Sequence, residues 1–197
     1  MIEKAMAFAS AIFSGDGSGH DFDHTMRVYR MAMRIASEEG ADAELVALAA
    51  LLHDVDDHKL SPDTCERKDR AVGFLQHHGV PEEQVQKIIQ IISEISFSAG
   101  KGRPTTIEGM CVQDADRLDA MGAIGIGRAF AFGGSRGRRM HDPENVDRTT
   151  SIQHFYDKLL RLKDLMNTKT GRELALQRDA YMRQFLDEFY AEWDGRK

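Results

Sequence analysis

Residues 45–54 read LVALAALLHD. The first eight residues of this stretch are apolar on every side of a helix, and a helix with that pattern is a buried one. Asp42 lies just before the stretch and is suited to cap the helix, whereas Gly40 is suited to end the helix that precedes it. His53 and Asp54 therefore close a buried helix, and two polar groups in that position need partners.

Helical periodicity continues in both directions from this segment, and no convincing two-residue alternation indicates a strand. An opening amphipathic helix accounts for Ile2, Met6, Ala9 and Phe13. We expect further helices from His24 to near Gly40, over 66–79, over 82–97 with the core face Val85, Ile88, Ile89, Ile92 and Ile95, over the glycine-containing pattern 112–127, and as two helices within 151–193. Residues 132–147 form the longest non-periodic stretch. The sequence predicts an all-α helical bundle.

The size and charge of the chain limit the classes of protein to consider. A length of 197 residues, with 42% hydrophobic residues, predicts one globular domain over 1–197. The net charge of −6 argues against a partner that is a nucleic acid polymer. No apolar run is long enough for a membrane span, and two distant cysteines predict no disulfide framework. We therefore expect a cytoplasmic protein without a membrane partner.

Four side chains could hold a metal ion. His24 near the start of one helix, His53 and Asp54 at the end of the next, and Asp116 much later would supply two imidazoles and two carboxylates. Such a mixture of ligands is better suited to a divalent transition metal with open positions than to a structural zinc site. The spacing alone is weak support, because eight histidines and many aspartates would form several such sets by chance.

Three segments resemble the H…HD…D signature of the HD-domain phosphohydrolase superfamily, namely HTMRV at 24–28, LLHDVDD at 51–57 and DADRL at 114–118. The segments 112–127 and 155–168 are also similar to a bacterial branch of small, single-domain HD hydrolases, so the resemblance covers almost the whole chain. It implies an HD-type helical bundle and the metal ligands His24, His53, Asp54 and Asp116. Asp119, one helical turn beyond Asp116, remains a competitor for the fourth position.

The resemblance implies that a divalent ion activates water for hydrolysis of a phosphate ester or anhydride. Asp57, four residues after His53, is the candidate catalytic acid or base. Candidate substrate-binding cations are Arg27, Lys59 and Arg117. Arg136, Arg138 and Arg139 either close over a substrate or belong to a solvated loop.

The function that this resemblance implies is a hydrolase of a small phosphorylated metabolite, with a nucleotide as the favoured substrate and nucleoside triphosphate pyrophosphohydrolysis as the favoured reaction. One ion is expected, Mn²⁺ before Fe, Ni, Co or Mg, because His77 and His78 fit a helix end better than a second metal site. An HD-fold di-iron oxygenase and a non-catalytic metal-stabilised binding module are the alternatives. Four aromatic residues of the last helix are expected to contact either the bundle or the second subunit of a homodimer: Phe185, Phe189, Tyr190 and Trp193.

Overall fold

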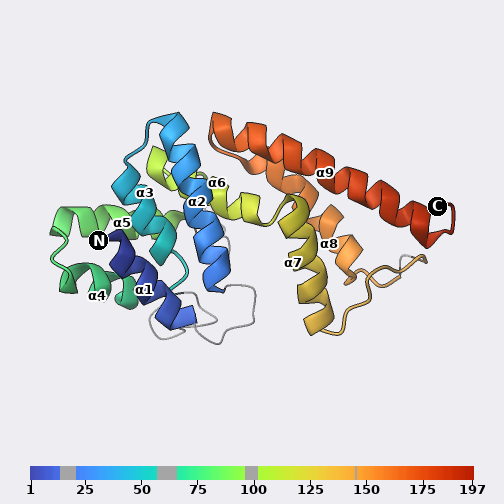
Figure 1. Ribbon diagram of the computed structural model, residues 1–197, viewed down its shortest axis with the longest axis horizontal. Helices are drawn as coiled ribbons and strands as arrows, with labels where there is room; N and C mark the ends of the chain where they lie inside the picture. The colour runs from blue at the N-terminus through green and yellow to red at the C-terminus, as the bar shows by residue number, and fades with distance from the viewer. Residues whose placement is uncertain (14–20, 57–65, 96–101, 145) are drawn as a thin grey trace. The chain divides into compact units, whose positions relative to one another are not determined.

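The computed structural model describes residues 1–13, 21–56, 66–95, 102–144 and 146–197. These residues form helices and connecting segments without any β-strand, which confirms the predicted all-α class (Figure 1). They divide into two compact units, Met1–Asp116 and Arg117–Lys197, and the boundary falls inside helix α6 (Ile107–Asp119). The single domain expected over residues 1–197 stays a prediction.

The first unit is arranged around α3 (Ala43–Leu52), which packs against α1 (Ile2–Phe13), α2 (Phe22–Glu39) and α5 (Glu82–Ile95). Every residue from Val46 to Leu52 is buried. Burial of each leucine side chain stabilises the folded state by about 2 kcal/mol, so the apolar sequence of α3 accounts for its central position. The prediction of a buried helix over 45–52 is confirmed, with Leu45 half-buried at its start.

The ends of α2 and α3 are also as predicted. Gly40 ends α2 with φ 70°, a backbone conformation that glycine adopts without strain. The Asp42 carboxylate then caps α3 by accepting hydrogen bonds from Glu44 N at 2.9 Å and Leu45 N at 3.1 Å. In α5 the expected core face needs one correction, since Ile91 is buried whereas Ile89 is only half-buried.

Helix α4 (Asp69–His77) lies within the helix predicted over 66–79, but its start has an unusual cap. Lys68 precedes the helix in a left-handed conformation with φ 57° and provides no side-chain cap. The cap comes from Asp56 instead, whose fully buried carboxylate accepts hydrogen bonds from Arg70 N at 3.2 Å and Ala71 N at 3.0 Å. This contact ties the residues just after His53 and Asp54 to α4.

The second unit contains α7 (Gly122–Ser135), α8 (Ser151–Asp157), the 3₁₀ helix η2 (Leu159–Leu165) and α9 (Lys169–Trp193). The pattern expected over 112–127 is divided between α6 and α7, because Gly122 starts α7 with φ 68°. Residues 132–135, expected to be non-periodic, belong to α7. There Gly133 lies so close to Ser151 that an added Cβ would be 2.1 Å from the Ser151 hydroxyl oxygen.

Aromatic and ionic contacts hold α9 within this unit. Phe185 and Phe189 contact Phe130 of α7, and Trp193 contacts His141. These contacts show that Phe185, Phe189 and Trp193 pack within this unit, as expected for contact with the bundle, whereas a homodimer stays a prediction.

Asp179 of α9 is buried and pairs with Lys163 of η2 at 3.0 Å and with Arg183 at 2.8 Å. Burial opposes ionisation of Asp179, but these hydrogen bonds outweigh it and lower the pKa of the carboxyl. The pair with Lys163 fixes η2 to α9.

Candidate metal centre

His24 lies in the first turn of α2 and is almost fully buried. The side chain of Asp21 begins this helix by accepting a hydrogen bond from His24 N at 2.7 Å. Asp21 therefore fixes the backbone from which the His24 imidazole projects.

His53 is the C-terminal cap residue of α3, and its ring is oriented by its own helix. Its Nδ1 lies 2.8 Å from the carbonyl oxygen of Ala50. Because a carbonyl oxygen can only accept, Nδ1 carries the proton, and in the neutral ring Nε2 keeps its lone pair. That lone pair makes Nε2 the atom available to a metal ion.

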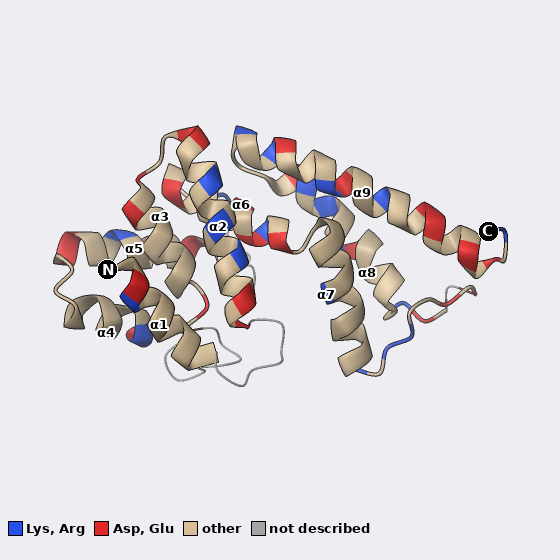
Figure 2. Cartoon of the chain, viewed as in Figure 1, with Lys and Arg blue, Asp and Glu red and all other residues tan. Residues whose placement is uncertain are grey.

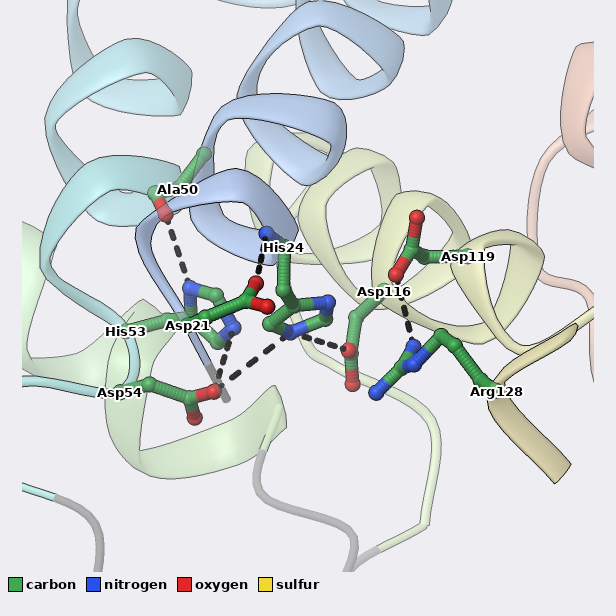
Figure 3. Close-up of polar contacts among 8 residues, drawn as sticks. All are labelled: Asp21, His24, Ala50, His53, Asp54, Asp116, Asp119 and Arg128. Atoms are coloured by element: carbon green, nitrogen blue, oxygen red, sulfur yellow. Dashed lines mark hydrogen bonds and ion pairs between the residues drawn. The ribbon is translucent and has the colours of Figure 1, made fainter. Parts of the chain in front are cut away.

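Figure 3 shows the two imidazoles and two carboxylates converging. Asp54 Oδ2 lies 3.2 Å from His53 Nε2 and 3.5 Å from His24 Nε2. Asp116 Oδ1, from α6, lies 3.5 Å from His24 Nε2. The four predicted ligands are thus brought together from α2, from the two residues that directly follow α3, and from α6.

The electrostatic field at this cluster favours a cation. Burial alone would lower the pKa of His53, but Asp54 and, more weakly, Asp116 raise it to about 9 in the metal-free protein. The same negative field that retains a proton on the imidazole also attracts a metal ion, which would replace that proton.

The geometry fits a divalent transition metal. One ligand atom from each of His24, His53 and Asp54 lies within 4.8 Å of the other two. Ligand atoms bound about 2.0–2.2 Å from one ion lie within about 4.4 Å of one another, so only a small contraction is needed. The mixture of nitrogen and oxygen donors is the kind that such metals accept.

The structure separates Asp116 from its competitor Asp119. The Asp119 carboxylate is buried and accepts a hydrogen bond from Arg128 Nη1 at 2.7 Å, whereas Asp116 faces His24. An aspartate already neutralised by arginine is a poorer metal ligand, because the cation competes for the same oxygen. This geometry favours Asp116 as the fourth ligand.

The predicted substrate-binding and catalytic residues are placed less completely. Arg27 is half-buried on α2, one turn after His24. Arg117 donates a hydrogen bond to the carbonyl oxygen of Leu165 in η2, a structural contact that the sequence did not reveal. Asp57 and Lys59 lie outside the described residues. The roles of all four stay predictions.

Comparison with known proteins identifies the family. The HD domain model matches residues 21–121, which include all four candidate ligands. The chain belongs to the HD domain family, and its fold and candidate site support a metal-dependent phosphohydrolase in general.

Two bacterial proteins illustrate the similarity. The uncharacterized protein YpgQ of Bacillus subtilis (strain 168) is 44% identical over 192 residues, which cover 93% of this chain and 89% of YpgQ. The crystal structure of an HD-superfamily hydrolase from Bacillus thuringiensis is 43% identical with a TM-score of 0.84, covering 98% of this chain and 96% of that one.

The crystal structure of B. subtilis YpgQ in complex with ADP has a TM-score of 0.83 and covers 98% of this chain and 97% of that one. Its identity to this chain is 38%. In the described part of the chain, no helix combines the length and apolar character that a membrane span requires.

Proposed function

We propose that this chain is a cytoplasmic, metal-dependent pyrophosphohydrolase of nucleoside triphosphates, with one divalent ion held by His24, His53, Asp54 and Asp116. The observation that carries the proposal is the convergence of donor atoms from His24, His53 and Asp54 within 4.8 Å, with Asp116 3.5 Å from His24. Mn²⁺ is the favoured ion, because carboxylate oxygens suit Mn²⁺ and this donor set lacks the cysteines that are common in structural zinc sites.

The nucleotide part of the proposal is supported by a relative. YpgQ of B. subtilis has been crystallised with ADP, and the similarity to this chain extends over 98% of its length. ATP, a nucleoside triphosphate, contains the same adenosine and the same two phosphates as ADP. The proposed reaction adds water across the bond between the α- and β-phosphates and releases a nucleoside monophosphate and pyrophosphate.

The side chains of the site would divide the chemistry between them. When bound, a divalent ion lowers the pKa of coordinated water and polarises a phosphoryl oxygen. The Ala50 carbonyl keeps Nε2 of His53 directed at the site, and the Asp21 cap positions His24. Asp57 would orient the attacking water and take its proton, while Arg27, Lys59 and Arg117 would neutralise phosphate charge.

The test combines elemental analysis of the purified protein with a screen for phosphate and pyrophosphate release from nucleotides and sugar phosphates in Mn²⁺. Asp54→Ala should abolish both metal retention and product release. The matched control is Asp69→Ala, an exposed aspartate that pairs with Arg67 on the surface and should change neither property.

Three outcomes would contradict the proposal. Product release by Asp54→Ala at the unsubstituted rate would show that the site is elsewhere. Two irons per chain with oxygen consumption would identify an oxygenase, and metal retention without any hydrolysis would identify a binding module.

Asp57→Ala should keep the metal but lower kcat, which separates the catalytic base from the ligands.

A further inference from the structure

Two arginines follow the end of α7 in a turn with a defined backbone. The N–H groups of Arg136 and Arg138 both donate to the carbonyl oxygen of Gly133, at 3.1 and 2.9 Å. Between them Gly137 has φ 66°, which allows the chain to reverse, and its N–H donates to Gly134 O at 3.1 Å. In Figure 2 the colour of Lys and Arg marks this segment after α7. The turn places both arginines directly after the end of the helix.

Both guanidinium groups lie against one aromatic ring. The central carbon of Arg136 is 5.5 Å from the centroid of the Phe132 ring, and that of Arg138 is 5.4 Å from it. Phe132 itself is 41% exposed. Cation–π attraction at these distances helps to order the two guanidinium groups.

The other cations of the second unit are differently placed. Within its described residues, each other lysine and arginine has a hydrogen bond, an ion pair or another contact, in several cases with a backbone carbonyl: Arg117, Arg128, Arg139, Arg148, Lys158, Arg161, Lys163, Lys169, Arg172, Arg178, Arg183, Arg196 and Lys197. Arg136 and Arg138 have no acidic partner among those residues. Even the adjacent Arg139 is paired with Asp142 at 3.1 Å.

The charge of Arg138 also acts on His154, in addition to the burial of that histidine. The pKa of His154 is lowered by burial first, and then by the charges of Lys158 and Arg138, with Asp157 acting weakly in the opposite direction. Like charges collected on one surface repel each other, and an anion bound between them removes that repulsion. In a chain with a net charge of −6, such a local excess of positive charge is not a general property of the surface.

We propose that Arg136 and Arg138, ordered by Phe132, form a binding site for the phosphate chain of a diphosphate or triphosphate. Each guanidinium offers a planar fork of N–H donors that matches phosphate oxygens, and two such forks suit two neighbouring phosphates. The site contains none of the proposed metal ligands, so it goes beyond the proposed hydrolysis and does not require a metal ion.

The test measures binding of ADP and of inorganic pyrophosphate to the full chain in EDTA by isothermal titration calorimetry, on an Asp54→Ala background. Replacing both arginines by glutamine should weaken both ligands about tenfold or more, because charge-assisted hydrogen bonds to phosphate are lost. The matched control is Arg161→Gln, which removes one charge from the same unit, where Arg161 donates a hydrogen bond to the backbone carbonyl of Asp157. It should change the affinity less than about twofold.

Each other outcome overturns the proposal. Unchanged affinity in the double variant would exclude the two arginines, and an equal loss with Arg161→Gln would reveal general attraction to charge. Adenosine bound as tightly as ADP would show that the base, not the phosphate chain, is recognised. Absence of any ADP or pyrophosphate binding to the metal-free chain would also refute the site.

Phe132→Leu should give an intermediate loss of affinity, since the arginines keep their charge but lose the ring that orders them.

Discussion

Replacing Asp56 by Asn should lower the thermal stability of the metal-free protein, because this carboxylate caps a helix that begins well beyond it in the chain. Asp56 is fully buried and accepts hydrogen bonds from Arg70 N and Ala71 N. An amide keeps one acceptor oxygen but turns its NH₂ group toward the second N–H. The loss comprises one charge-assisted hydrogen bond, about 1.5–3 kcal/mol, and the interaction of the charge with the helix dipole, about 0.3–1 kcal/mol.

The expected cost is therefore about 2–4 kcal/mol in the free energy of unfolding, or a fall of about 4–16 °C in Tm for a chain of this size. Unfolding followed by far-ultraviolet circular dichroism in EDTA measures it. The matched control is Asp69→Asn in the first turn of the same helix, an exposed residue whose substitution should cost less than about 1 kcal/mol. Equal Tm values for the two variants would refute remote capping by Asp56.

Three further predictions concern other parts of the chain. Asp21→Ala should destabilise α2 by about 1 kcal/mol and lower Mn²⁺ affinity in a metal titration, whereas Asp21→Ser should restore most of both because serine also caps. The lowered pKa of Asp179 means that its stabilising contribution is present above about pH 4 and is lost as the pH falls through the folded-state pKa, so urea unfolding of Asp179→Asn should show a flatter loss of stability in acid. Gly133→Ala should destabilise the protein by about 1–3 kcal/mol through overlap with Ser151, and thermal unfolding of the double variant with Ser151→Ala should recover most of that loss, because the nearest remaining side-chain atom lies at 3.4 Å.

The fold could be predicted wherever the local sequence is decisive. The apolar residues of α3, its cap Asp42 and the terminating Gly40 all act within a few positions along the chain. The prediction was wrong at the end of α7, because glycine has low helix propensity and the helical conformation of Gly133 is accompanied by a tertiary contact with Ser151. It also overlooked the break at Gly122, where a helical pattern continues through a residue with positive φ.

The candidate site was predictable to the extent that motifs identify side chains. His24, His53, Asp54 and Asp116 were named from the sequence, and the structure brings them together. The hydrogen bonds that position these side chains and the segment after them were not predicted. The Ala50 carbonyl has no side-chain signature, and a hydrogen bond between residues 14 or 15 positions apart, as at Asp56, leaves no periodic pattern. Asp21 had a detectable signal, an aspartate directly before a helix.

The hydrogen bond from His53 to Ala50 has a consequence for protein design. Donor and acceptor are three residues apart, so the direction of the imidazole is determined within a single helical turn. A segment comprising α3 and its final His-Asp pair could be grafted into another buried helix without rebuilding surrounding loops to orient the ring. The recipient would need only a second imidazole and a further carboxylate at matching depth. In this sense α3 with its His-Asp pair would be a transferable module for half of the candidate metal centre.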